Sequence, residues 1–360
     1  MRRISPKYAK PEMVVESPVY DNFGNILLEA NTKLNKACLE LLINDEVAEI
    51  FLNDWRVTDV VVEPLISPEL EGKATQTLLR LIIENQGKTS ITASNVEQVL
   101  TTMNAVTQEL ALDSKGEAAV AGIVSQENYM YIQSAKVAAL SILMGKRLGY
   151  NTFDLTNLGM AALLKDVGYI AIPQEILQRP DLLAEKELLK IRQHPTFGYE
   201  LLNQHDATGG EVANAVLQHH ERWNGTGYPH GLKGTDISRF AQIIAIADTY
   251  TALLSKRPGR KIHTSCEAIE YIMAYGGVQF NPELAESFVR QVPCYPPGLT
   301  VKLNTKEIGI VSDPNLGFIG RPITRIIYDE DQGKAKRPYD IDLSKADYQH
   351  KLITEVLDYY

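Results

Sequence analysis

The 360-residue chain is 44% hydrophobic and 22% charged, which are the proportions of a globular protein with two or three domains. Its formal net charge of −9 disfavours a protein that coats duplex nucleic acid by neutralising phosphates. Without an apolar run near the roughly 18 residues of a membrane helix, and without a signal-peptide pattern, the chain is expected to be cytoplasmic and to have no membrane span.

The chain begins with a small α+β unit, expected over residues 1–66. Short strands are predicted at Met13–Tyr20 and Asn25–Leu28, because apolar and β-branched residues flank a turn at Asp21–Gly24. A helix near Lys36–Leu42 follows.

The middle of the chain is helical. A helical connector is predicted over residues 67–117, where apolar residues recur at helical spacing. The main domain is predicted to be an all-helical core over residues 118–292. Its helices are expected at Tyr129–Leu148, Leu155–Val167, Ala184–Gln193, Thr196–Asn203, Glu211–His220 and Ser238–Leu254.

The last part of the chain changes to a β pattern. A small β extension is expected over residues 293–335, and residues 336–360 are polar enough to form a partly mobile tail. The strands of the β extension are predicted at Thr300–Leu303, Glu307–Val311 and Ile323–Tyr328. The predicted fold class is therefore mainly α, with a small α+β N-terminal domain, a helical bundle and a short C-terminal β unit.

The three cysteines, Cys38, Cys266 and Cys294, are odd in number, widely spaced and without a Cys-x-x-Cys motif. Neither a disulfide framework nor a thiolate zinc site is expected. Buried free thiols in a reducing compartment are the simpler interpretation.

Five of the seven histidines lie between residues 194 and 230, and two of these are adjacent. His219 and His220 end an apolar helix, where neighbouring side chains diverge by about 100°, so they can share an ion only beyond the helix end. On this string alone the alternative is a solvated helix terminus, at which histidine complements the helix dipole.

Two aspartates favour the metal interpretation. Asp248 lies in an almost wholly apolar helix, and Asp166 ends another helix just before Gly168. A buried carboxylate needs a cation or a pairing partner. Carboxylates and imidazoles from separate helices are what a non-thiolate metal centre in a helical bundle requires. Pairing of Lys165 with either aspartate, and His194 as an ordinary helix-end residue, remain the alternatives.

A glycine-rich loop, Asn224–Gly234, follows the histidine pair and can bring its backbone close to a phosphate. The later segment Thr249–Cys266 has no acidic residue. Its basic residues, Lys256, Arg257, Arg260 and Lys261, suit a phosphate clamp. The alternative is a solvated basic helix end.

Residues from about 118 to 292 resemble the HD-GYP domain, a helical subgroup of the HD metal-dependent phosphohydrolases. The most specific match is His219–Pro229, with the sequence HHERWNGTGYP. Further matches are Gly231–Gly234, Ala245–Asp248, Leu163–Gly168, Ile172–Pro173 and His194–Pro195 with Gly198.

The resemblance implies a bacterial signalling protein that hydrolyses cyclic di-GMP with a hydroxide held between two or three metal ions, usually iron or manganese. It implies a catalytic, bridging role for Asp166, with His194, His219 and His220 as ligands of one metal and Asp248 as a ligand of another. It also implies that Gly227, Tyr228, Arg257 and Arg260 contact the ligand. A related nucleotide, a signalling protein at the GYP loop and a second copy of the chain are further partners to consider.

Three site positions depart from the family pattern. Gln133 and Lys165 stand where the family has metal-binding histidines, and Tyr169 replaces the lysine that assists at the phosphate. Tyr129 stands where some members supply an acidic ligand. One metal position therefore loses two imidazoles, whereas the other keeps Asp166 and its three histidines. Lys165 can place its positive charge beside the aspartates and offset the absent cation.

Three functions compete on this basis. The favoured one is a degenerate family member that binds a cyclic dinucleotide or a partner protein, with one metal ion and little or no hydrolysis. The second is a working phosphodiesterase with an atypical, mononuclear centre. The third is an interaction domain without metal.

Overall fold

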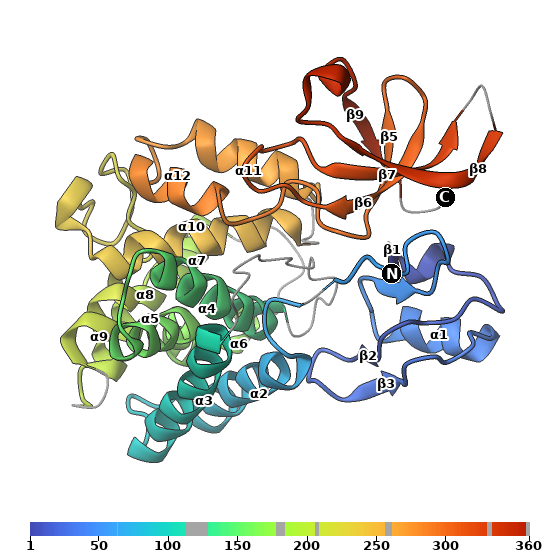
Figure 1. The fold of residues 1–360 in the computed structure, drawn as a ribbon. Coiled ribbons are helices and arrows are strands. Elements are labelled where there is room, and N and C mark those ends of the chain that lie inside the picture. The colour runs from blue at the N-terminus through green and yellow to red at the C-terminus, as the bar shows by residue number, and fades with distance from the viewer. Residues whose placement is uncertain are drawn as a thin grey trace.

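The computed structural model describes residues 1–62, 64–112, 129–177, 184–205, 209–255, 261–329 and 333–357. The chain forms a small N-terminal α+β unit, a large helical body and a C-terminal antiparallel sheet (Figure 1). The mainly helical fold class predicted from the sequence is confirmed.

The N-terminal unit contains two short antiparallel strand pairs and one helix. Its elements are β1 (Arg2–Ile4), η1 (Pro6–Tyr8), β2 (Val19–Tyr20), β3 (Ile26–Leu28), α1 (Lys36–Asn44) and β4 (Ile50–Leu52), with β1 paired to β4 and β2 to β3. The Asp21 carboxylate accepts hydrogen bonds from the backbone N–H groups of Phe23 and Asn25, both at 2.8 Å, and so fixes the turn after β2. Val15, Leu34 and other buried residues give the unit a core of its own.

The helical body surrounds a single core. Its elements are α2 (Pro68–Asn85), α3 (Ala93–Leu112), α4 (Tyr129–Arg147), α5 (Thr152–Leu164), η2 (Val167–Ala171), α6 (Gln174–Leu177), α7 (Glu185–Ile191), α8 (His194–Leu202), α9 (Gly209–Gln218), η4 (Gly234–Asp236), α10 (Arg239–Leu254), α11 (Ser265–Ala274) and α12 (Pro282–Val289). Leu78 of α2 and Met103 of α3 belong to the same buried cluster as Leu140 of α4 and Leu158 of α5. The pair of helices expected as a connector over residues 67–117 therefore packs into this core.

The C-terminal sheet has five antiparallel strands in the order β8-β7-β6-β5-β9. Its elements are β5 (Thr300–Leu303), β6 (Ile308–Asp313), β7 (Ile323–Asp329), β8 (Gly333–Asp342), η5 (Ala346–Tyr348) and β9 (Ile353–Val356). Residues 336–357, expected to lie in a polar tail, instead supply most of β8 and all of β9. A small hydrophobic core at this sheet includes Ile341, Leu343 and Ile353. Because charged residues surround them in the sequence, their spacing does not predict strands.

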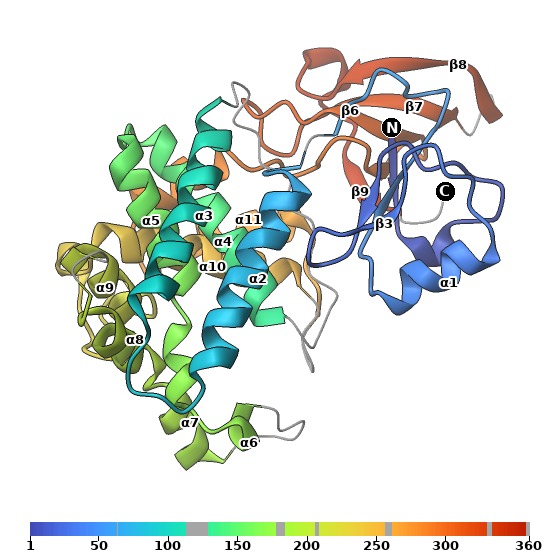
Figure 2. The ribbon, with the colours of Figure 1, turned by 90° about the horizontal axis from the view of Figure 1, so that it is seen from below.

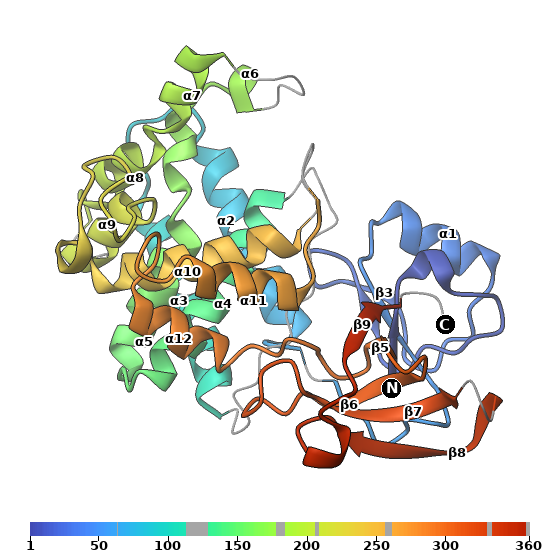
Figure 3. The ribbon, with the colours of Figure 1, turned by 90° about the horizontal axis from the view of Figure 1, so that it is seen from above.

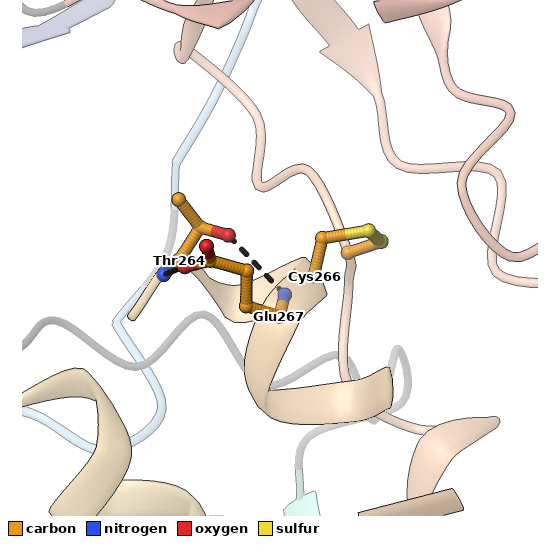
Figure 4. The surroundings of a disulfide bond; sticks show 4 residues. Thr264, Cys266 and Glu267 are labelled. Atoms are coloured by element: carbon orange, nitrogen blue, oxygen red, sulfur yellow. Dashed lines mark hydrogen bonds between the residues drawn. A yellow bond between two sulfur atoms is a disulfide. The ribbon is translucent and has the colours of Figure 1, made fainter. Parts of the chain in front are cut away.

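A disulfide joins Cys266, near the start of α11, to Cys294, just after α12 (Figure 4). The expectation of free thiols is therefore wrong for these two residues, and Cys38 is the free cysteine among the described residues. The two cysteines are 28 residues apart, but the fold of α11 and α12 brings their Cα atoms to 4.3 Å. Thr264 and Glu267 cap α11 beside the disulfide by exchanging hydrogen bonds of 2.8 and 3.2 Å.

The N-terminal unit contacts both other parts, and Figures 2 and 3 show it beside the start of α2 and beside the sheet. Toward the sheet, Arg325 of β7 donates to the Asp59 carboxylate at 2.8 Å. Toward the helices, the turn after β2 packs directly on α2, because a Cβ atom on Gly72 would lie 2.1 Å from the carbonyl oxygen of Phe23. Gln76 donates to the same oxygen at 3.1 Å.

Among the described helices, none is long and apolar enough to cross a lipid bilayer.

Candidate metal centre

The first part of the site is built where α5 ends. Asp166 lies two residues after the last residue of α5, Leu164, and is only 5% exposed. Gly168, two residues later, lies so close to α8 that a Cβ atom there would be 1.9 Å from the carbonyl oxygen of His194. Glycine at this position therefore lets the start of α8 approach, and the His194 Nε2 atom lies 3.3 Å from the Asp166 Oδ1 atom.

Two histidines are held in one tautomer by backbone carbonyl groups. The Nδ1 atom of His194 lies 2.7 Å from the carbonyl oxygen of Ile191, and that of His219 lies 2.7 Å from the carbonyl oxygen of Val216. Because a carbonyl oxygen only accepts, each Nδ1 atom carries a proton, and each Nε2 atom is the ring nitrogen turned toward Asp166. Metal-binding histidines are oriented by hydrogen bonds of this kind.

The donor atoms converge on one point. Asp166, His194, His219 and His220 each offer a ligand atom, and these atoms all lie within 4.8 Å of one another. The Nε2 atoms of His194 and His219 are 3.3 Å apart, and that of His219 is 3.9 Å from the Asp166 Oδ1 atom. Imidazole and carboxylate donors from separate segments of the chain thus meet in one largely buried place, where they can share a cation. The donor set therefore fits a divalent metal ion.

The charge states agree with this fit. Burial, together with the neighbouring His194, lowers the pKa of His219 to about 4, and burial also lowers the pKa of His220 well below its usual value. Burial raises the pKa of the Asp166 carboxyl, but the Lys165 ammonium, His194 and His219 together outweigh burial and hold the pKa well below its usual value. Neutral imidazoles and an ionised carboxylate are the forms that bind metals.

Asp248, expected as a ligand of a second metal, lies in a different environment. Its Oδ1 atom is 3.0 Å from the Lys165 ammonium and accepts a hydrogen bond of 2.8 Å from the Gln133 amide. Lys165 also pairs with the Oδ2 atom of Asp166, so its ammonium lies between the two carboxylates. Burial lowers the pKa of Lys165, but Asp166 and Asp248 outweigh burial and raise it, so the side chain remains charged. Lys165 and Gln133 thus surround the carboxylate that a second metal ion would need.

Two tyrosines stack on the histidines. Tyr169 lies against His194 with ring centroids 4.5 Å apart, and Tyr228 lies against His220 with centroids 4.7 Å apart. The guanidinium group of Arg192 lies 5.5 Å from the centre of the Tyr228 ring, within the range of a cation–π contact. Arg192 was not among the residues predicted for the site, since a single arginine two residues before His194 forms no distinctive motif.

The glycine-rich loop folds back over the end of α9. The buried Glu221 carboxylate accepts hydrogen bonds from the backbone N–H groups of His230 at 2.7 Å and Leu232 at 3.0 Å. Gly227 lies against this turn, where a Cβ atom would be 2.4 Å from the backbone nitrogen of Arg222. Glu221 therefore holds the loop that carries Tyr228. Its place directly after the histidine pair was the available sequence signal.

The predicted site residues are brought together in part. Asp166, His194, His219 and His220 form the metal cluster, and Gln133, Lys165, Tyr169, Gly227, Tyr228 and Asp248 lie around it. Arg257 and Arg260 lie outside the described residues, so their role as a phosphate clamp remains a prediction.

The chain is similar in sequence to a known domain family and to several characterised proteins. The HD domain family model matches residues 92–284. The chain is 31% identical over 230 residues to the cyclic di-GMP phosphodiesterase PA4108 of Pseudomonas aeruginosa, which covers 64% of this chain and 55% of that protein. It is 32% identical over 253 residues to the cyclic di-GMP phosphodiesterase response regulator RpfG of Xanthomonas campestris pv. campestris, covering 69% of this chain and 65% of that protein.

The matched part of the chain thus spans less than two thirds of the length of either relative. Among solved structures, Bd1817, a HDG"Y"P protein from Bdellovibrio bacteriovorus, matches with a TM-score of 0.51 and 17% identity, covering 79% of this chain and 97% of that chain. This structural match shows a common fold.

Proposed function

This chain belongs to the HD-GYP family of HD domains, and from that premise and its site geometry we propose that it is a cyclic di-GMP signalling protein with one metal ion. Lys165 takes the place of a second ion, and hydrolysis is weak or absent. The observation that carries this proposal is the position of the Lys165 ammonium between Asp166 and Asp248.

Asp166, His194, His219 and His220 would hold the ion, for which iron or manganese suits the mixture of imidazole and carboxylate donors. When bound, the ion supplies a Lewis acid for a phosphate oxygen and lowers the pKa of a bound water. Tyr228, on its glycine-rich loop, offers a flat aromatic surface next to the same cluster. This side of the site therefore retains groups that can hold a nucleotide.

The second metal position lacks the donors that it needs. A protonated lysine has no lone pair, and the Gln133 amide points its N–H toward Asp248. Two metal ions clamp the attacking and the leaving oxygen of a phosphoryl transfer, and one ion with a fixed ammonium reproduces only part of that arrangement. Binding with slow or no turnover follows from this difference.

A second candidate function is an active phosphodiesterase with a mononuclear centre. The observation that favours it is the intact four-donor cluster, in which burial lowers the pKa of His219 and His220 and so favours their neutral forms. The Lys165 ammonium could also stabilise negative charge on a phosphoryl oxygen.

Chromatographic turnover of cyclic di-GMP separates the two candidates. The protein is purified without oxygen, supplied with Fe(II) or Mn(II), and compared with Asp166→Ala, which removes a carboxylate from the cluster. Calorimetric binding of the same nucleotide is measured in parallel. The proposal expects binding that depends on the metal, with no more product than the variant gives. Linear product formation that disappears in Asp166→Ala would establish the active enzyme instead. Absence of both metal and nucleotide binding would leave an interaction domain without metal.

A further inference from the structure

A cavity of about 420 Å³ lies between the N-terminal unit and the helical body, away from the metal cluster. Small-molecule sites usually measure about 300–1,000 Å³ and occur preferentially between domains. One wall comes from the N-terminal unit and includes Val19 and Phe51. The opposite wall comes from the helices and includes Ile132 and Ala139 of α4. Figure 1 shows the N-terminal unit beside the helical body.

The cavity separates two hydrophobic cores that do not merge. Val19 and Ile50 belong to the core of the N-terminal unit, whereas Ile66 and Ile132 lie in or beside the helical body and line the facing wall. Phe51 and Leu65, which also line the cavity, are only half-buried, and apolar surface left in contact with water is unfavourable by roughly 25 cal/mol per Å². An apolar ligand body would therefore be stabilised by covering both walls.

The walls are held in place by direct contacts. Gly72 of α2 touches the backbone of the turn after β2. A side chain at this position would not fit, because its Cβ atom would lie 2.1 Å from the Phe23 carbonyl oxygen. Arg3 and Glu49, which both line the cavity, form an ion pair across the β1–β4 region. A cavity with fixed walls binds a ligand without the cost of ordering them.

The charged groups of the lining decide which ligand suits the cavity. Among the residues that the structure describes, the lining carries five carboxylates and two basic side chains. Each basic side chain lies beside a carboxylate: Arg3 beside Glu49, and Lys136 at 3.6 Å from Glu71. The other three carboxylates belong to Asp21, Asp45 and Glu46. The net negative charge disfavours an anion such as a nucleotide and favours a cation. The rings of Tyr20 and Phe51 offer cation–π contacts in addition.

We propose that this cavity binds a small organic cation, namely a protonated amine on an apolar body. Neither the metal centre nor the cyclic dinucleotide takes part in this site. The proposal therefore stands or fails independently of the proposed function.

The test uses three probes of nearly equal shape: 4-phenylbutylamine, 4-phenylbutanol and 4-phenylbutanoic acid. Binding to the full chain is measured by calorimetry, and the melting temperature is followed as a function of probe concentration. We expect the amine to bind at least about tenfold more tightly than the acid, with the alcohol between them. Ala48→Trp places an indole in the lining, and we expect it to abolish binding of all three probes.

A second variant tests the charge without filling the cavity. Asp45→Asn with Glu46→Gln should reduce the preference for the amine over the alcohol. The matched control, Asp347→Asn with Glu355→Gln, removes the same charge from exposed positions in the C-terminal part and should leave that preference unchanged. Acid binding as tight as amine binding, amine binding unchanged in a folded Ala48→Trp, or no binding of any probe would each overturn the proposal.

Discussion

Replacing Lys165 by methionine tests whether its ammonium stands in for a metal ion. Methionine keeps much of the side-chain length and removes the charge. The Lys165 side chain is 3% exposed and that of Asp166 is 7% exposed, so the variant leaves buried carboxylates without their cation. We expect Lys165→Met to destabilise the metal-free protein strongly.

The magnitude follows from the geometry. At an effective dielectric constant of about 20, the attraction between the Lys165 ammonium and the Asp248 carboxylate oxygen at 3.0 Å is about 5 kcal/mol. Part of this loss is offset in Lys165→Met, because the variant no longer buries an ammonium group and so avoids its desolvation free energy. Breaking a buried ion pair by removing one partner typically costs about 3–5 kcal/mol, and we expect a loss of that size.

The assay is urea unfolding of the metal-free protein, followed by circular dichroism. Lys36→Met provides the control, because its ammonium is largely exposed and forms an ion pair with the exposed Glu40 on the same helix. We also expect Mn(II) to stabilise Lys165→Met more than the parent, since a second ion can then balance the two carboxylates. Equal stability of Lys165→Met and Lys36→Met would refute the reasoning.

Two further changes test how the site is assembled. Gly168→Ala should cost several kcal/mol of unfolding free energy in urea, because its Cβ atom would meet the His194 carbonyl, whereas Gly210→Ala has open space and should shift it by at most about 1 kcal/mol. A Gly168→Ala protein as stable as Gly210→Ala would show that α8 can move aside. Changing a residue that only hydrogen-bonds to a metal ligand lowers metal affinity by about 10–100-fold. His219→Ala removes a ligand itself and should lower Mn(II) affinity by more than that, whereas His230→Ala changes an exposed loop residue and should leave the affinity unchanged. Equal losses in calorimetry would remove His219 from the ligand set.

Asp166, His219 and His220 could be singled out because each stands at the end of an apolar helix, where an imidazole or a carboxylate is costly to bury alone. The role of His194 as a ligand was implied by the family resemblance. Pairing of Lys165 with Asp166 and Asp248 was among the alternatives, and the structure brings these three side chains together. The resemblance assigned Asp248 to a different metal position from these four donors, and the structure places its carboxylate beside Lys165 and Gln133. The hydrogen bond from the Gln133 amide was not predictable, since it depends on how α4 packs on α10.

Other features depend on contacts between distant segments. The Cys266–Cys294 disulfide requires the packing of α11 on α12, which the spacing of two cysteines does not reveal. β9 is recognisable as a strand only through its pairing with β5. Its four residues show only a weak alternation of apolar and polar side chains, so the sequence alone does not predict it. Arg192 contacts Tyr228 across 36 positions of sequence, and only the folded loop brings them together.

The most direct test of the central claim is the metal content of the protein after reconstitution with Fe(II) or Mn(II) without oxygen, measured by elemental mass spectrometry. With Lys165 in the second position, we predict about one ion per chain, and about two in the Gln133→His, Lys165→His double variant, which restores two imidazole donors. Two ions in the parent protein, or an unchanged count in the double variant, would contradict the claim that Lys165 replaces a metal ion.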